Sequence, residues 1–290
     1  MKRLTAVNVP LDMSPNAFGE LRESNDSVAD VSRLRQRMAE DGYLFFRDFL
    51  DHQWVLEARR QVVESLAKQN VLDENHPSVE AMAARYARTG CTPEDRRFPA
   101  VRKLTHTGRM IEFYREFMGG EVRPYDRIWM RLMSPGSVTG AHYDIVYSGR
   151  GTTNLYTSWI PLGDIPLSHG PLMVLEKSHL LENLKATYGR MDIDKNRNWK
   201  KIRFRHWRLF RGGDYSRNPR AVQRQFGLRW LTADFRVGDV VIFTAFTMHG
   251  SLDNVSDRIR ISVDTRYQLR SEPIDERWIG EHPIAHSQAE

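Results

Sequence analysis

Apolar residues recur at helical spacing in the first 120 residues of the chain. Val31, Leu34 and Met38 fall on one side of a helix, and a second amphipathic helix is expected over 109–118. A glycine follows both segments, which favours the left-handed conformation in which helices often end. Residues 43–46 form a short apolar run of strand length. The N-terminal part is therefore expected to consist of helices around one strand.

From about residue 121 onward, the apolar pattern changes to a period of two. The predicted strands span 125–133, 153–162, 171–176, 239–246 and 259–268. They are rich in Val, Ile, Thr and aromatic residues and are separated by turns that contain Pro and Gly. Several short strands of this kind form a sandwich or a barrel. We expect one domain, with a helical buttress and the first strand at 1–120, a β core at 121–270 and a tail at 271–290.

The composition excludes several classes of protein. Of the 290 residues, 40% are hydrophobic, which is enough for a sizeable core, so a disordered chain is excluded. The longest apolar runs are short, such as 240–243, so no membrane-spanning helix is expected. Cys91 is the single cysteine, and the first residues contain no apolar stretch that could act as a signal peptide. These features favour a cytoplasmic protein.

The positive charge of the chain is concentrated in one segment. Lys and Arg number 43 against 37 Asp and Glu, which gives a net charge of +6. Residues 195–224 contain eleven basic residues and one acidic residue, so this basic segment carries +10 and the rest of the chain carries −4. We expect it to belong to an insertion at about 180–230 that covers part of the mouth of the β core as a mobile flap. A plain solvated surface or a contact between subunits is the simpler alternative.

His142 and Asp144 form a candidate metal-binding pair. They follow a strand and its turn, and in an extended backbone residues i and i+2 project to the same face. The third ligand could be His249, which closes the strand predicted at 239–247. Two imidazoles and one carboxylate make the facial triad of non-haem Fe(II) oxygenases. The His-x-Asp pair alone is a weak signal, because a histidine hydrogen-bonded within a loop gives the same pattern.

The residues after His249 strengthen this interpretation. Ser251 follows two residues later, and Arg260 opens the last predicted strand. An inward-facing arginine in a barrel needs an anion, and a dicarboxylate supplies one through a bidentate, charge-assisted pair. Asp264 and Arg266 lie an even number of residues after Arg260 and therefore share its face of the strand, so we expect them to face inward as an ion pair.

Several longer sequence motifs point to a protein family. The motifs are HYD at 142–144, SWIPLGD, GPLMVLEKSH and GDVVIFTAFTMHGSLDNVSDRIRISVDTRYQ in the β core, and GYLFFRDFL at 42–50. Together they resemble the phytanoyl-CoA dioxygenase family of Fe(II)/2-oxoglutarate-dependent oxygenases, and in particular its bacterial small-molecule hydroxylases. The resemblance covers 42–50 and most of 121–270. This chain departs from the usual family pattern at Lys177, where a glycine commonly stands.

The resemblance implies a fold, a reaction and a set of site residues. The fold would be a double-stranded β-helix, a cupin-like jelly roll, with N-terminal helices against its major sheet. The implied iron ligands are His142, Asp144 and His249. Arg260 and Ser251 would bind the distal carboxylate of 2-oxoglutarate, Trp159 would wall the cosubstrate pocket, and Arg131 would face the active centre.

The expected function is hydroxylation, or a related two-electron oxidation such as desaturation, of a C–H bond in a small molecule, with O₂ as co-reactant and succinate and CO₂ as products. The basic segment favours an anionic substrate, and the oligomeric state stays open. Two other classes of protein are considered. One is a jelly-roll binding protein without catalysis, against which the complete ligand set argues. The other is a nucleic-acid-directed protein, since aromatic and basic residues interleave in the basic segment as single-strand binding requires.

Overall fold

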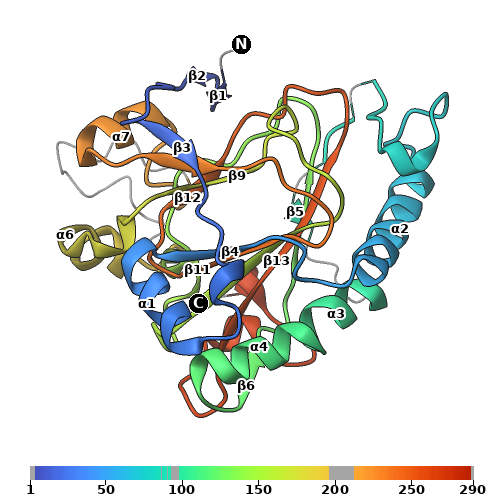
Figure 1. The fold of residues 1–290 in the computed structure, drawn as a ribbon. Helices are drawn as coiled ribbons and strands as arrows, with labels where there is room; N and C mark the ends of the chain where they lie inside the picture. The colour runs from blue at the N-terminus through green and yellow to red at the C-terminus, as the bar shows by residue number, and fades with distance from the viewer. Residues whose placement is uncertain (1–3, 86, 90, 93–97, 196–211, 289–290) are drawn as a thin grey trace.

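The fold is built from two principal β sheets, with helices outside the larger sheet (Figure 1). The computed structural model describes residues 4–85, 87–89, 91–92, 98–195 and 212–288. The helices are α1 (Val31–Asp41), α2 (His52–Lys68), α3 (Pro99–His106), α4 (Arg109–Met118), α5 (Ile145–Ser148), α6 (Glu182–Ala186) and α7 (Pro219–Phe226). The strands are β1 (Thr5–Ala6), β2 (Val9–Pro10), β3 (Phe18–Glu20), β4 (Tyr43–Phe46), β5 (Cys91–Thr92), β6 (Val122–Pro124), β7 (Trp129–Met133), β8 (Tyr156–Pro161), β9 (Leu172–Leu175), β10 (Trp230–Thr232), β11 (Val240–Thr244), β12 (His249–Ser251) and β13 (Arg260–Leu269). Short 3₁₀ helices are η1 (Asn25–Ser27), η2 (Ser78–Glu80), η4 (Ser178–Leu180), η5 (Tyr188–Arg190), η8 (Glu276–Trp278) and η9 (Ala285–Gln288).

The strands pair mostly with partners that are distant in the sequence. The larger sheet has the order β4-β11-β8-β13-β7-β5, and β6 pairs with the end of β13. The smaller sheet has the order β12-β9-β10-β3, in which β10 and β3 run parallel and the other pairs are antiparallel. This arrangement confirms the predicted mainly β fold with flanking helices and a jelly-roll core.

The larger sheet is buried on both faces. In β4, Leu44 and Phe46 pack with the helices, whereas Tyr43 and Phe45 pack with side chains of the smaller sheet. The same alternation holds in β11. Because successive side chains of a strand point to opposite faces, one face of this sheet packs against the helices and the other lines the space between the two sheets.

The helices α1 to α4 cover the outer face of the larger sheet, and their apolar sides join its core (Figure 1). α1 begins where the Asp30 carboxylate accepts a hydrogen bond from the Arg33 N–H (3.1 Å), and it ends at Gly42, whose φ is 80°. α4 ends in the same way at Gly119, whose φ is 75°. A left-handed φ favours glycine, so the helix ends predicted from the sequence are confirmed.

The structure departs from the sequence-based expectation in its shorter elements. β10 and β12 contain three residues each, too few to give a period-two pattern, and α3 is not among the helices predicted from the sequence. His249 begins β12 instead of closing a strand at 239–247. The expectation of an extended His-x-Asp segment is also wrong, because Asp144 has φ −65° and ψ −30° and turns the chain into α5.

The residues that flank 196–211 lie beside the His-x-Asp residues. Ile193 N donates to Val146 O (3.1 Å), and Tyr215 N donates to Ala141 O (2.7 Å). The sequence predicts a mobile flap over 195–224. Of this flap, residues 196–211 lie outside the described residues, whereas its C-terminal part enters α7, in which Pro219, Val222 and Gln223 are buried. The aromatic side chains that suggested nucleic-acid binding fall within 196–211: Trp199, Phe204, Trp207 and Phe210.

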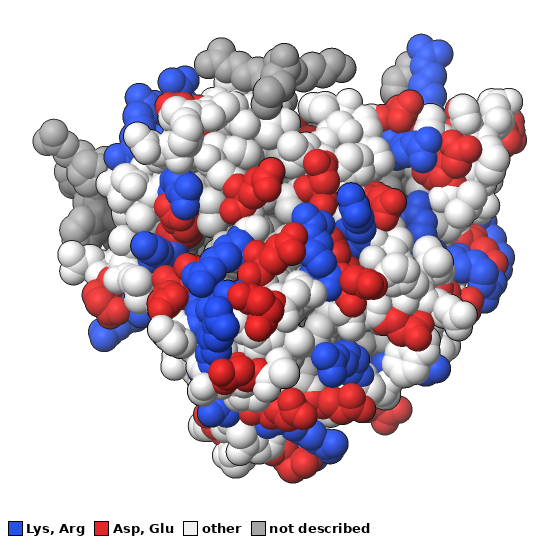
Figure 2. Space-filling model, viewed as in Figure 1, with Lys and Arg blue, Asp and Glu red and all other residues white. Residues whose placement is uncertain are grey.

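Acidic and basic side chains are interspersed on the face of the molecule seen in Figure 2. Ion pairs on the helices include Arg33 of α1 with Asp26 (3.3 Å) and Arg115 of α4 with Glu121 (3.0 Å). The net positive charge is therefore not concentrated on this face. In the part of the chain that the structure describes, no helix is both long enough and apolar enough to cross a membrane.

Candidate metal centre

A backbone bridge places His142 and His249 side by side. The His142 N–H donates to the His249 carbonyl (2.9 Å), and the His249 N–H donates to the His142 carbonyl (3.0 Å). The centroids of the two imidazole rings are 4.1 Å apart, and each residue is only 5% exposed. Two histidines from distant parts of the sequence therefore meet in the protein interior.

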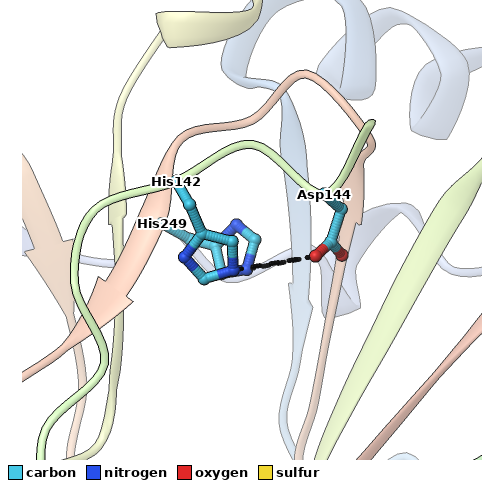
Figure 3. Close-up of side chains that lie close together, drawn as sticks. All are labelled: His142, Asp144 and His249. Carbon is cyan, nitrogen blue, oxygen red and sulfur yellow. Dashed lines mark ion pairs between the residues drawn. The ribbon is translucent and has the colours of Figure 1, made fainter. Parts of the chain in front are cut away.

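Asp144 completes a compact group of donor atoms (Figure 3). Its Oδ1 lies 3.7 Å from Nε2 of His142 and 3.7 Å from Nε2 of His249. One ligand atom from each of the three residues lies within 4.8 Å of the others. The structure thus brings together the three residues expected as ligands. Two imidazole nitrogens and one carboxylate oxygen suit a first-row divalent metal ion such as Fe(II).

Hydrogen bonds orient both imidazole rings. Nδ1 of His142 donates to the Gly140 carbonyl (2.9 Å), and Nδ1 of His249 donates to the Thr247 carbonyl (3.0 Å). A carbonyl can only accept, so each Nδ1 carries the proton and each Nε2 has a free lone pair facing the centre. Burial lowers the pKa of both imidazoles, and this keeps them in the neutral form that binds metals.

The third donor is a carboxylate. Burial alone would raise the pKa of Asp144, but the Arg266 guanidinium and the two histidines outweigh burial and hold this pKa well below its ordinary value. The residue is 1% exposed and is ionised at neutral pH. The centre therefore offers one negative charge and two neutral nitrogen donors to a metal ion.

A cavity next to the histidines contains the other residues singled out in the sequence. Arg131, Trp159, Ser251 and Arg260 all line it, as do both histidines of the centre. The Arg260 guanidinium lies 5.9 Å from the Trp159 ring centroid. The Ser251 hydroxyl accepts a hydrogen bond from the Thr139 N–H (2.9 Å). The structure therefore gathers all of these candidates around one space beside the metal centre.

Arg260 is a buried cation that lacks a counter-ion in the described part of the chain. It is 3% exposed, its NH1 donates to the Ser262 hydroxyl (2.8 Å), and its Nε has no hydrogen-bond acceptor. No described carboxylate oxygen lies within 4.0 Å of its guanidinium nitrogens. Burial, together with the nearby Arg131, lowers the pKa of Arg260 to about 9. A buried charge of this kind is costly unless an anion pairs with it.

The neighbouring charges on β13 and β7 are paired. Arg266 NH1 donates to Asp264 Oδ1 (2.6 Å), which confirms the ion pair expected from the sequence. Arg131 donates to the same carboxylate from Nε (2.6 Å) and from NH2 (3.2 Å). Arg266 NH2 also donates to Asp144 Oδ1 (2.7 Å), so the network reaches the metal centre.

Sequence reasoning missed two contacts of the centre. One is the Thr157 hydroxyl, which donates to Asp144 Oδ2 (2.5 Å), and the other is the bond from Arg266 to the same carboxylate. The only signal available was periodicity. Thr157 shares a face of β8 with Trp159, and Arg266 shares a face of β13 with Arg260. Period two gives the face of the sheet but not the residue that lies opposite.

Comparisons with known proteins agree with this geometry. Residues 38–262 match the family model described as phytanoyl-CoA dioxygenase (PhyH), whereas no curated protein sequence matches significantly. EctD from S. alaskensis, solved with 2-oxoglutarate and 5-hydroxyectoine, has 18% identity and a TM-score of 0.60, over 94% of this chain and 87% of that chain. The epimerase SnoN from nogalamycin biosynthesis has 18% identity and a TM-score of 0.58, over 88% and 93%. The carbocyclase SnoK from the same biosynthesis has 18% identity and a TM-score of 0.56, over 87% and 86%. At this level of identity, the likeness shows the fold.

The fold and the centre first define a class: a double-stranded β-helix with a His-Asp-His cluster at the edge of an internal cavity, as in the non-haem iron oxygenases. The family match spans most of the sequence and includes all three residues of the cluster. The chain therefore belongs to the phytanoyl-CoA dioxygenase family of Fe(II)/2-oxoglutarate-dependent oxygenases.

Proposed function

We propose that this protein hydroxylates a C–H bond of a small, anionic molecule. In this proposal, His142, Asp144 and His249 hold Fe(II), and Arg260 anchors the distal carboxylate of 2-oxoglutarate. The observation that carries the proposal is the buried Arg260 guanidinium, which lines the same cavity as the two histidines and has no described counter-ion. A dicarboxylate with one end at the metal would place its other carboxylate beside the Arg260 guanidinium, where the two could form an ion pair.

The residues of the centre fit an iron ion. One ligand atom from each of the three residues lies within 4.8 Å of the others, and the Nδ1 side of each ring is fixed by a backbone carbonyl. Such outer hydrogen bonds hold metal-binding histidines in the correct tautomer. With three protein ligands, a six-coordinate metal keeps three open positions for cosubstrate and O₂.

The remaining cavity residues would bind and orient the cosubstrate. Ser251 lies close enough to Arg260 to line the same space and would add a hydrogen bond to the distal carboxylate. The Trp159 ring would wall the pocket, and Arg131 would contribute a second positive charge, although Asp264 already pairs with it. When bound, Fe(II) with 2-oxoglutarate and O₂ supplies the oxidation, with succinate and CO₂ as products. The protein contributes ligands, orientation and exclusion of water.

The proposal of hydroxylation and of an anionic substrate has separate support. EctD was solved with a hydroxylated compound, while SnoN and SnoK are described as an epimerase and a carbocyclase, so relatives of this fold differ in outcome. The proposal follows EctD, whose bound compound carries a hydroxyl group. The anionic substrate is supported by the charge of +10 on residues 195–224, a segment in which the Tyr215 N–H donates to the carbonyl of Ala141, the neighbour of His142 (2.7 Å).

Two measurements test the proposal. Oxygen uptake and succinate formation by the purified protein should require both Fe(II) and 2-oxoglutarate, even without substrate. A thermal-shift screen of a metabolite library, with Fe(II) and 2-oxoglutarate present and O₂ excluded, should then identify stabilising compounds, and anionic compounds should be enriched among them. A protein that neither binds iron nor consumes 2-oxoglutarate would contradict the proposal. Hits without any enrichment of anions would contradict the substrate class alone.

A further inference from the structure

The two oxygens of the Asp144 carboxylate have different surroundings. Oδ1 is the oxygen 3.7 Å from both histidine Nε2 atoms, and it also accepts a hydrogen bond from Arg266 NH2 (2.7 Å). Oδ2 accepts a hydrogen bond from the Thr157 hydroxyl (2.5 Å). A carboxylate has about two lone pairs on each oxygen. The protein therefore holds both oxygens, but only Oδ1 faces the metal centre.

The strand register of the larger sheet places the two side chains that hydrogen-bond to the Asp144 carboxylate. Thr157 of β8 and Arg266 of β13 are directly opposite each other in the antiparallel ladder. Side chains of such a pair project to the same face of the sheet. They therefore reach the same carboxylate from neighbouring strands, and all three residues are at most 3% exposed.

Arg266 is itself held rigidly. Its NH1 donates to Asp264 Oδ1 (2.6 Å), and its guanidinium carbon lies 4.0 Å from the Trp129 ring centroid. Asp264 is in turn paired with Arg131, which lines the cavity proposed for the cosubstrate. A planar guanidinium that bridges two carboxylates has little freedom to rotate. The position of its NH2 group is therefore well defined.

We propose that Arg266 and Thr157 are positioning residues that restrict Asp144 to a single coordinating oxygen. This inference rests on the proposed function and concerns the number of open metal positions. A carboxylate that bound a metal through both oxygens would occupy two positions and leave too few for a bidentate cosubstrate together with O₂. Thr157 withholds Oδ2 from the metal, and Arg266 fixes the rotation of the carboxylate.

The charge of Arg266 distinguishes a role in positioning Asp144 from a role in strengthening metal binding. A guanidinium hydrogen-bonded to a metal ligand repels the incoming cation and weakens the carboxylate as a donor. Removal of Arg266 should therefore not weaken metal binding through charge. What should be lost is the geometry that leaves room for 2-oxoglutarate. The two affinities are thus expected to respond differently to the same substitution.

The experiment compares Thr157→Val, Thr157→Ser, Arg266→Gln and Arg115→Gln in the full-length protein without O₂. Thr157→Val removes the hydroxyl at nearly constant shape, and Thr157→Ser keeps it. Arg115→Gln is the matched control for charge, since Arg115 lies on α4, is 52% exposed and pairs with Glu121 (3.0 Å). Fe(II) affinity is measured by competition with a chelator. The affinity for 2-oxoglutarate is measured from the visible charge-transfer absorption of the Fe(II)–2-oxoglutarate complex.

We expect Thr157→Val and Arg266→Gln to bind Fe(II) at least as tightly as the wild type, while their affinity for 2-oxoglutarate falls by about tenfold or more, a loss of about 1.4 kcal/mol of binding free energy. Thr157→Ser should keep the wild-type affinity, and Arg115→Gln should not change it. Parallel loss of both affinities, or no change in either, would overturn the inference. If Arg266→Gln does not fold, Thr157→Val decides the outcome. A wild-type protein without the charge-transfer absorption would instead contradict the proposed function.

Discussion

The main chains of His142 and His249 are hydrogen-bonded to each other in both directions, at 2.9 and 3.0 Å. The proximity of the two imidazoles is thus a property of the backbone and does not depend on either ring. Asp144 is placed by different means, since it directly precedes α5 and its carboxylate is held by side chains of the larger sheet. Removal of one imidazole should therefore leave the fold and the other two ligands in place.

The first prediction follows from this bridge. His249→Ala should lower iron occupancy and 2-oxoglutarate turnover by more than about hundredfold, because loss of a mere partner of a ligand already costs about 10- to 100-fold. The far-UV circular dichroism should be unchanged. Iron content and succinate formation of the purified variant measure the effect. Wild-type iron affinity and turnover in this variant would show that His249 is not a ligand.

The second prediction concerns the buried cation Arg260. Arg260→Ala removes one partner of the proposed ion pair with 2-oxoglutarate, and loss of one partner of a buried pair typically costs about 3 to 5 kcal/mol. The concentration of 2-oxoglutarate required for half-maximal turnover should therefore rise by roughly a hundredfold or more. Steady-state kinetics with varied 2-oxoglutarate measures this effect.

A rise of less than about tenfold, or 1.4 kcal/mol, would mean that another residue anchors the cosubstrate. From the sequence alone the next candidate is Arg258. The structure favours Arg131, because Arg131 lines the cavity whereas Arg258 is 41% exposed and pairs with Glu80. Arg131→Ala and Arg258→Ala would then separate the two candidates.

Alternation along a strand is the part of the site that the sequence predicts best. On β13 the period of two places Arg260, Asp264 and Arg266 on the inner face, and the structure agrees. The helices at the N-terminus were also predictable, because glycine ends and apolar spacing are local signals. Such features depend on residues that are close together in the sequence.

What the sequence could not predict depends on contacts between distant segments. The pairing of Thr157 with Arg266 is a matter of strand register, and no local pattern specifies it. The helical backbone of Asp144 likewise follows from the way the chain turns at the cavity. At Lys177, where the resemblance suggests glycine, φ is 55°, so the chain keeps the left-handed turn with a residue that adopts it less easily.

The third prediction concerns stability as a function of pH. Burial, together with the nearby Arg102, lowers the pKa of His106 to about 4, while its contact with Tyr125 and the charge of Asp126 oppose the shift. The unfolded chain binds this proton at about pH 6.5. The folded protein therefore loses stability as the pH falls from about 6.5 to 4, because the unfolded state takes up the proton first.

The variant His106→Gln has no titrating group at this position, while its amide can still donate a hydrogen bond. Between pH 7 and pH 5, the free energy of unfolding of this variant should fall by about 2 kcal/mol less than that of the wild type. Denaturant titrations of both metal-free proteins at the two pH values measure the difference, and the contributions of other histidines cancel. Equal losses in the two proteins would show that His106 is not the group responsible.

The fourth prediction concerns halide chemistry. In the proposed centre, Asp144 Oδ1 would occupy the position that a halide ion would need at the metal, and Arg266 and Thr157 hold this carboxylate by hydrogen bonds. The unaltered enzyme should therefore give only oxygenated product in chloride buffer once its substrate is known. Mass spectrometry of the product checks this expectation. A chlorinated product from the wild type would show that the carboxylate leaves the metal during turnover.

The fifth prediction concerns the basic segment at 195–224. A charge of +10 on a chain whose remainder carries −4 creates a positive potential, and at physiological ionic strength screening confines it to about 8 Å. Within the segment, the Tyr215 N–H donates to the carbonyl of Ala141, the neighbour of His142, so this potential would act near the mouth of the cavity. Replacement of Arg203, Arg205 and Arg208 by glutamine should therefore lower kcat/KM for the anionic substrate.

A matched control separates the local potential from the net charge. Arg33, Arg60 and Arg115 lie on α1, α2 and α4, and each is more than half exposed in an ion pair with a nearby carboxylate. Their replacement by glutamine removes the same total charge and should leave kcat/KM nearly unchanged. Added salt should reproduce the effect of the first triple substitution, because the screening length shrinks to about 3 Å at 1 M. Turnover of 2-oxoglutarate without substrate should be unaffected throughout, since the metal centre is intact. A kcat/KM that is indifferent to salt and to Arg203, Arg205 and Arg208 would assign the segment to solvated surface or subunit contact.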